Sequence, residues 1–270
     1  MRSGSRSASV QAVSTATDPN PPAPLPPHPM MQEYYADAAQ RRAFLTEIFD
    51  ATADDYDRVE RWLSFGSGRW YRRKALQRAG LKPGAQVLDV AVGTGLVARE
   101  ALAIVGPSGS VVGIDPSREM LKRAVDALGI AGHVAHAEAM PLAPASVDFI
   151  SMGYALRHMD DLRVVFTEQL RVLRPGGRVC VLEITRPTSA VGRAVLRGYL
   201  KFLSRTVGRI AGLRPRTGEL WEYYWETIDQ CVPPEKVMAA MTDAGFANVA
   251  RHRELGLFSE FTATKPATTA

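Results

Sequence analysis

The sequence predicts an α/β fold in which a doubly wound, mainly parallel sheet is covered by helices and preceded by a helical cap. Three observations lead to this prediction. After Pro83 and Gly84, short β-branched runs alternate with helical stretches. A glycine-rich turn at residues 91–95 joins one of these strands to the next helix. A length of 270 residues, with 46% hydrophobic and 23% charged residues, leaves room for a sizeable core.

The first 31 residues differ in composition from the rest of the chain. Five serines fall within the first 14 residues, and seven of the 18 prolines lie between Pro19 and Pro29. A segment of this kind has too little apolar surface to bury, so residues 1–31 are predicted to be a disordered arm.

Residues 32–82 are predicted to form a helical cap. Phe44, Ile48 and Phe49 follow a helical spacing, and a glycine- and serine-rich break at residues 64–68 divides the segment. The cap therefore consists of two helical parts that precede the sheet.

Residues 83–265 are predicted to form the sheet domain. Strands are expected at residues 86–90, 110–114, 133–137, 147–152 and 178–184. Helices are expected between them, at about residues 97–104, 117–128 and 162–173. Strands joined by helices of this length form a parallel sheet, which binds ligands at its carboxyl edge.

The turn after the first strand is built from small residues. Asp89, Ala91, Gly93 and Gly95 alternate along it. Small side chains let the backbone approach a ligand at the N-terminus of the following helix. Taken alone, the turn also matches a dinucleotide-binding fingerprint. It could also be a tight strand-to-helix turn that binds no ligand.

Further features favour S-adenosylmethionine (SAM) over a dinucleotide. The acid-and-glycine spacing resembles motif I of SAM-dependent methyltransferases, and the Asp89 carboxylate suits a cationic ligand. Asp115 stands 20 positions beyond Gly95 at the end of the next strand, where it can bind both ribose hydroxyls. Ser117 can cap the following helix, and Met120 can lie along the adenine. Hydride transfer is the weaker interpretation.

These residues belong to a longer series of segments in a fixed order. The series comprises Phe49-Asp50, Tyr56-Asp57, Leu63-Ser64-Phe65-Gly66, Ala137-Glu138-Ala139-Met140-Pro141, Tyr154-Ala155-Leu156-Arg157-His158, Leu173-Arg174-Pro175-Gly176-Gly177 and Asp243-Ala244-Gly245-Phe246. Over about residues 44–250 the chain resembles the ubiquinone/menaquinone biosynthesis C-methyltransferase family of class I SAM enzymes. The resemblance implies a Rossmann-like, seven-stranded sheet and methyl transfer from SAM to a ring carbon of a prenylated quinol.

Together with the loop residues, the resemblance implies a set of cofactor contacts. They are expected at Asp89, Ala91, Gly93, Thr94, Gly95, Asp115, Pro116, His136, Ala137 and Gly153. His136 stands where the family usually has Asn or Asp, and Gly153 replaces a serine. A histidine nitrogen can accept a hydrogen bond from the adenine amino group, but a surface histidine without a ligand is an equal alternative.

Arg157 and His158 follow the fourth predicted strand and are the candidate catalytic residues. Removing a phenolic proton makes a quinol ring carbon nucleophilic, and a base with a nearby cation assists this step. The alternatives are an ion pair of Arg157 with Asp160 or Asp161 and a solvated histidine. Methyl transfer needs no metal, and none is expected.

A basic amphipathic helical insertion is predicted at about residues 188–230. Between Glu183 and Glu219 there is no acid, and eight basic residues occur: Arg186, Arg193, Arg197, Lys201, Arg205, Arg209, Arg214 and Arg216. The insertion either packs on the sheet with a solvated basic face, or lies on anionic lipid and admits a polyprenyl chain.

Composition excludes several classes of protein. Cys180 and Cys231 are too few for a disulfide scaffold or a four-thiolate zinc site. No apolar run approaches the ~20 residues of a membrane span. We therefore expect a cytoplasmic protein, with peripheral contact to the inner face of the membrane as an open alternative.

Other functions compete with quinol methylation. A methyltransferase acting on nucleic-acid bases usually carries an [N/D]-P-P-[Y/F] motif after the fourth strand, but residues 153–156 read Gly-Tyr-Ala-Leu, so no nucleic-acid partner is expected. Val92, Ala155 and His158 depart from the family pattern. These departures leave open another aromatic or lipid acceptor, or a SAM-binding protein without catalysis.

Overall fold

The computed structural model describes residues 23–63, 67–210 and 215–267. Within them a seven-stranded sheet has the order β3-β2-β1-β4-β5-β7-β6. Its strands are β1 (Gln86–Val90), β2 (Ser110–Asp115), β3 (Ala131–Val134), β4 (Val147–Gly153), β5 (Leu173–Ile184), β6 (Ala247–Glu254) and β7 (Phe258–Thr264). Strands β1 to β5 pair in parallel, whereas β7 is antiparallel to both β5 and β6. The predicted fold class is confirmed.

Helices cover both faces of the sheet because its strands are apolar on both sides. Val87 of β1 belongs to an apolar cluster with residues of α2 (Gly68–Arg78), α3 (Leu96–Val105) and α4 (Arg118–Leu128). Its neighbours Leu88 and Val90 belong to the cluster that contains α5 (Leu162–Val172) and α8 (Pro234–Asp243). This double covering is typical of parallel sheets and leaves the strand ends as the place for a site.

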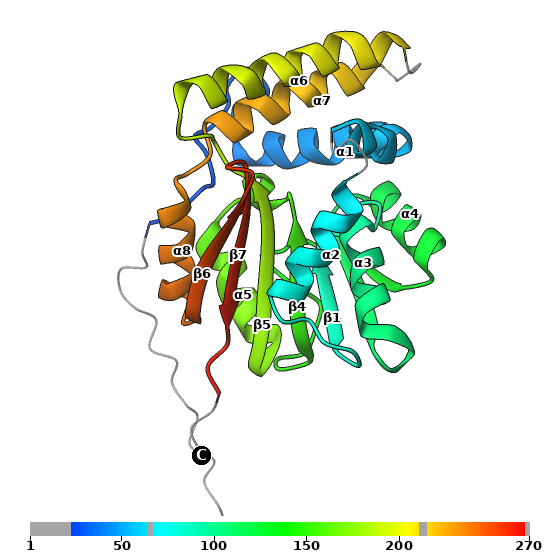
Figure 1. The fold of residues 1–270 in the computed structure, drawn as a ribbon, viewed down its shortest axis with the longest axis vertical. Coiled ribbons are helices and arrows are strands. Elements are labelled where there is room, and N and C mark those ends of the chain that lie inside the picture. The colour runs from blue at the N-terminus through cyan, green and yellow to red at the C-terminus, as the bar shows by residue number, and fades with distance from the viewer. Residues whose placement is uncertain (1–22, 64–66, 211–214, 268–270) are drawn as a thin grey trace, which may run out of the picture.

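Three helices lie across the carboxyl end of the sheet. They are α1 (Ala38–Leu63), α6 (Ala190–Ile210) and α7 (Pro215–Asp229), which stack above the strands in Figure 1. Aromatic side chains join α1 to α7, with the rings of Phe44 and Tyr223 5.3 Å apart. Within the described residues, no helix is both long enough and apolar enough to cross a membrane.

Two predicted strand boundaries are wrong. The strand expected at residues 133–137 occupies Ala131–Val134, because its pairing ends where Val134 meets Asp115, the last residue of β2. His136 and Ala137 therefore lie in the loop that follows β3. Strand β5 begins at Leu173 rather than at residue 178, because Leu173 already pairs with Val147 of β4.

The N-terminal arm is packed where the structure describes it. Leu25 donates its backbone N–H to Asp161, and Val232 donates to the carbonyl of Pro27. His28 and Met31 are buried. Residues 23–31 are therefore ordered, in contrast to the predicted disordered arm, because the buried side chains of His28 and Met31 and the backbone hydrogen bonds hold them against the domain. The prediction for residues 1–22 lies outside the described residues.

Candidate active site

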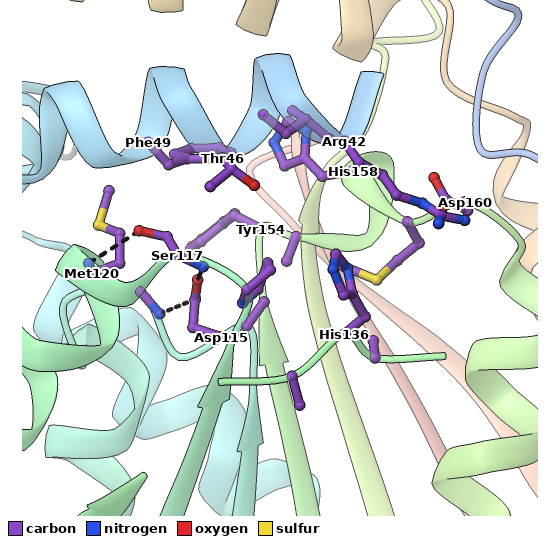
Figure 2. Close-up of a pocket in the computed structure, with 18 of the residues that line it drawn as sticks. Arg42, Thr46, Phe49, Asp115, Ser117, Met120, His136, Tyr154, His158 and Asp160 are labelled. Carbon is purple, nitrogen blue, oxygen red and sulfur yellow. Dashed lines mark hydrogen bonds and ion pairs between the residues drawn. The ribbon is translucent and has the colours of Figure 1, made fainter. Parts of the chain in front are cut away.

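A pocket of about 880 Å³ opens at the carboxyl ends of β1, β2 and β4, under helix α1 (Figure 2). It brings together many of the residues that the sequence predicts for cofactor binding. Those that line it are Ala91, Gly93, Asp115, Pro116, His136, Ala137 and Gly153, together with the candidate catalytic residue His158.

The turn after β1 borders open space. Ala91 and Gly93 both have positive φ angles, +52° and +54°. A Cβ atom added at Gly93 would meet no atom within 4 Å. The small residues of this turn therefore leave room beside the pocket for a ligand, as the sequence pattern predicts.

Asp115 points its carboxylate into the pocket from the end of β2 (Figure 2). One oxygen accepts the N–H of Gly93 at 2.8 Å, and the other accepts the N–H of Ser117 at 2.9 Å. Burial raises the pKa of Asp115 to about 6, although both backbone hydrogen bonds oppose this change. Each carboxylate oxygen keeps a further lone pair, which suits the two hydroxyls of a ribose.

Ser117 and Met120 begin helix α4 beside this carboxylate. The Ser117 hydroxyl accepts the N–H of Met120 at 3.1 Å and so caps the helix. The same hydroxyl donates to Asp50 of α1. Met120 is buried and lines the pocket, where its flexible apolar side chain can lie along an aromatic base.

Gly153 ends β4 at a point of close approach. An added Cβ would lie 2.5 Å from Cγ2 of Val97 on α3. Any side chain at this position would therefore require Val97 to shift. At this position the chain can offer a ligand only backbone groups.

Three of the predicted cofactor residues do not line the pocket: Asp89, Thr94 and Gly95. Asp89 is buried beneath the turn, and burial raises its pKa to about 7. It accepts a hydrogen bond from Ser151 at 2.6 Å, while its Oδ2 has no partner among the described residues. Thr94 donates its hydroxyl to Asp57 at 2.5 Å. Asp89 therefore lies outside the pocket, and the hydrogen bonds from Ser151 and from the backbone of Ala98 oppose the rise in its pKa.

Helix α1, part of the predicted helical cap, forms the roof of the pocket. The sequence does not identify its lining residues, which are Arg42, Leu45, Thr46, Phe49 and Tyr56. Three acids on one face of the helix bind the opposite wall: Asp50 accepts from Ser117, Asp57 accepts from Thr94, and Asp54 pairs with Arg123. Acids at positions 50, 54 and 57 share a helical face, and this spacing was the available signal.

His158 lies in the short helix η2 (Leu156–His158) and faces the pocket from the side opposite Asp115 (Figure 2). Its ring stacks on Tyr223 at 5.7 Å and meets Phe49 edge-on at 5.3 Å. Both ring nitrogens are buried and have no hydrogen-bond partner among the described residues. Burial, with nearby Arg157, lowers the pKa of His158 well below its usual value, so the ring is neutral at pH 7.

Arg157 precedes His158 but faces away from this pocket. Its guanidinium forms a fully buried ion pair with Glu183 of β5 and lies 4.8 Å above the ring of Tyr224. The alternative pairing with Asp160 or Asp161 is not present. Burial raises the pKa of Glu183, and the contact with Arg157 opposes this change.

Arg41 of α1 holds the loop that carries both residues. Its guanidinium donates to the carbonyl of Met159 and to Asp160, each at 2.8 Å, and to the carbonyl of Arg157 at 3.3 Å. Asp160 also pairs with Arg42, at 2.5 Å. The backbone around His158 is therefore fixed from the helix above it.

The pocket fits the adenosyl group expected from the sequence. The two carboxylate oxygens of Asp115 suit the hydroxyls of a ribose. The open space at Gly93 lets a ligand lie against the backbone, and the apolar side chain of Met120 suits an aromatic base. Among the described residues, no cluster of three or more His, Cys, Asp or Glu side chains could hold a metal ion.

Comparison with known proteins gives a family match over most of the chain. A model of the ubiE/COQ5 methyltransferase family matches residues 36–265. The protein is 33% identical over 225 residues to the ubiquinone/menaquinone biosynthesis C-methyltransferase UbiE of Ectopseudomonas mendocina, covering 81% of this chain and 87% of that one. It is 34% identical over 217 residues to the UbiE protein of Shewanella woodyi, covering 78% and 85%.

A solved structure agrees on the fold. A SAM-dependent methyltransferase of Thermotoga maritima, described as a possible histamine N-methyltransferase, matches with a TM-score of 0.57. The match covers 82% of this chain and 99% of that chain at 23% identity. At this identity the likeness supports the sheet topology and nothing finer.

Proposed function

The chain belongs to the ubiE/COQ5 methyltransferase family, and from this premise we propose that it moves a methyl group from SAM to a ring carbon of a prenylated quinol. It is a SAM-dependent methyltransferase, as its family establishes. The proposed acceptor rests on its relatives, two of which are C-methyltransferases of ubiquinone and menaquinone biosynthesis.

The reaction makes limited demands on the protein. SAM supplies a methyl group already activated on a sulfonium, so a carbon nucleophile needs only to be aligned with it and deprotonated. The bond between the methyl carbon and the sulfonium sulfur breaks, a carbon–carbon bond to the ring forms, the demethylated donor leaves as a neutral thioether, and the ring gives up a proton. Alignment of this kind can supply ~7–11 kcal/mol of the barrier.

Residues around the pocket would orient the adenosyl part. The Asp115 carboxylate accepts hydrogen bonds from the ribose hydroxyls, and the turn at Ala91 and Gly93 leaves room for the amino-acid part of SAM. Ala137 and Met120 flank the base. Asp89 lies below the turn and outside the pocket, and its negative charge, when ionised, suits the cationic amino group of the donor without direct contact.

His158 is proposed as the base that accepts the phenolic proton of the quinol. A neutral imidazole has one nitrogen that can accept a proton, and the place of His158 at the pocket wall supports this role, although burial and Arg157 lower its pKa and so oppose protonation. Arg157 is proposed to stabilise the phenolate charge that remains, from the far side of Tyr224.

The observation that carries the proposal is the unpaired imidazole of His158 facing the same pocket as Asp115. His158 departs from the pattern of the family that the sequence resembles. This difference favours, as a second candidate, methylation of another phenolic aromatic or lipid acceptor by the same chemistry.

The proposal is tested with methyl-labelled SAM and a panel of reduced prenylated benzoquinols, naphthoquinols and simple phenols. We expect label on a quinol ring carbon. The variant His158→Phe keeps the ring stack on Tyr223 but removes both nitrogens, so kcat should fall about 100-fold with SAM affinity unchanged. A matched variant, His252→Phe on the exposed surface of β6, should retain full turnover.

Label on oxygen, or on a phenol but on no quinol, would point to the second candidate. Tight SAM binding without label on any acceptor would favour a SAM-binding protein without catalysis. Full turnover by His158→Phe would remove His158 from the mechanism.

Contact with anionic membrane is proposed for the exposed face of α6. Val191, Val195 and Phe202 share this face and are 60 to 74% exposed, and Leu255 of the β6–β7 turn is 84% exposed. The exposed basic residues Arg197 and Lys201 belong to the same helix on a neighbouring side, where Arg197 lies 5.9 Å from the ring of Trp225. Exposed apolar residues beside cations suit an anionic bilayer, at ~1 kcal/mol for each basic residue near the surface.

A flotation experiment tests this contact. The protein should float with vesicles of anionic lipid at low salt and stay behind with neutral vesicles or at high salt. The double variant Phe202→Glu with Leu255→Glu should lose flotation, whereas Val164→Glu on α5, also an exposed valine, should not. No association of the unaltered protein at low salt would end the proposal.

A further inference from the structure

A second cavity, of about 1240 Å³, lies beside the donor pocket. Its wall comes from α1, α2, α6, α7 and the turn between β6 and β7, and most of it is aliphatic or aromatic. The apolar lining residues are Tyr56, Trp70, Tyr71, Tyr154, Ile184, Leu196, Tyr199, Leu200, Tyr224, Ile228, Leu255, Leu257 and Phe258. A wall of this composition suits an apolar ligand.

Each charged residue of this wall has a partner of opposite charge, although Nε and Nη1 of Arg72 have no hydrogen-bond partner among the described residues. Arg72 forms an ion pair with Glu60, Arg157 pairs with Glu183, and the fourth, Glu254, lies 3.6 Å from Arg78. Burial of an unpaired charge opposite this wall would be costly. The portion of a ligand held here is therefore uncharged.

Three tyrosines belong to both cavities: Tyr56, Tyr154 and Tyr224. The phenols of Tyr56 and Tyr224 are hydrogen-bonded to each other, and burial raises the pKa of each. Two of the rings also contact arginine side chains. The guanidinium of Arg72 lies 5.9 Å from the ring of Tyr154, and that of Arg157 lies 4.8 Å from the ring of Tyr224. Tyr154 has a φ of +59°, an uncommon conformation for a side chain of this size, which sets the direction of its ring.

At its other end the cavity adjoins a surface hollow. The two share Leu196 and Tyr199 of α6 with Leu255 and Leu257 of the β6–β7 turn. The hollow also contains Val195, which with Leu255 belongs to the exposed apolar residues of this surface. The apolar cavity therefore shares lining residues with the donor pocket and also with the surface hollow.

We propose that the apolar cavity and the surface hollow form a channel for a long, uncharged hydrocarbon chain on the methyl acceptor. The acceptor ring then lies at the three tyrosines, within reach of the donor pocket, and the chain leaves the protein between α6 and the β6–β7 turn. This inference rests on the proposed function for the identity of the ring. The channel itself follows from the lining residues and their pairing.

Chain length is the first test. A tailless quinol and quinols with one, three and more isoprene units are compared in detergent solution. KM should fall as the chain lengthens until the channel is filled. Leu196→Trp, which fills the cavity, should raise KM for the long-chain quinol about tenfold and leave turnover of the tailless quinol unchanged.

Two further variants keep this test decisive. Leu257→Trp alters a half-buried position shared by cavity and hollow, and should act like Leu196→Trp even if the latter fails to fold. Val164→Trp makes the same kind of change on the exposed surface of α5 and should change neither KM. SAM affinity measured by calorimetry reports correct folding of each variant.

Photolabelling is the direct test and requires no turnover. A long-chain quinol with a diazirine at the chain end should label α6 or the turn near residues 255–257, as identified by mass spectrometry of the peptides. Label elsewhere, or KM values independent of chain length in all variants, would overturn the channel while leaving methylation of quinols intact. Label in the channel without methylation of any quinol would instead overturn the proposed function.

Discussion

Replacing Asp115 with asparagine is expected to raise the Kd for SAM about 100-fold. The carboxylate is the acceptor proposed for both ribose hydroxyls, and a charge-assisted hydrogen bond is worth roughly twice a neutral one. Asparagine retains the size of the side chain and one acceptor oxygen, but it loses the charge. Isothermal titration of SAM and of its demethylated product at pH 7.5 measures the effect.

The pH dependence of SAM binding provides the control for this variant. Because burial raises the pKa of Asp115 to about 6, the carboxyl becomes protonated as the pH falls below 6 and loses its capacity to accept from two hydroxyls. Affinity of the unaltered protein should therefore fall about tenfold for each pH unit below that value. Asp115→Asn should lack this titration. An equal pH profile in both proteins would remove Asp115 from the binding site.

The same raised pKa affects the stability of the protein without ligand. The folded state binds the Asp115 proton more tightly than the unfolded state does, so this group contributes stability below its unfolded pKa of about 3.8. That contribution is lost as the pH rises through about 6. Binding of SAM, which needs the ionised form, reverses this preference.

The variant Arg157→Met is expected to lower both stability and activity. It leaves the Glu183 carboxylate buried and unpaired, since both side chains of the pair are at most 2% exposed. Breaking such a pair costs roughly 3–5 kcal/mol of unfolding free energy, or about 10 °C in Tm for a chain of this size. Loss of the cation near the acceptor should lower kcat about 100-fold. Thermal unfolding and turnover at saturating SAM measure these effects.

A second substitution separates the structural from the catalytic role of Arg157. The double variant Arg157→Met with Glu183→Gln removes both charges, and should recover most of the lost stability because no unpaired charge stays buried. Its kcat should remain as low as that of the single variant. Recovery of kcat together with stability would show that Arg157 acts only by holding the fold.

The donor side of the site could be located from the sequence because its chemistry is local. A strand that ends in Asp89 and small residues, followed by a second strand that ends in Asp115, specifies a turn and an acceptor within about 30 positions. The structure brings Gly93 and Asp115 into direct hydrogen-bond contact. Short segments with a fixed backbone geometry of this kind are well determined by their own residues.

The roof of the pocket could not be predicted in the same way. The contact of Asp50 with Ser117 joins residues 67 positions apart, and nothing in either segment alone specifies it. The sequence also shows glycine at position 153 without a reason. The reason is Val97, a residue of another helix, whose side chain occupies the space of a Cβ. The separation of Arg157 and His158 into different cavities likewise depends on Glu183, a neighbour from a different strand.

The three tyrosines between the two cavities have a consequence for the order of events in each cycle. Exposed residues, His136 and Arg42, border the donor pocket on one side, and the channel proposed for the acceptor opens on another, beside α6. Two separate entrances mean that neither molecule has to depart before the other arrives. Initial rates should then follow ternary-complex kinetics. The demethylated donor and the methylated acceptor should be released independently of each other.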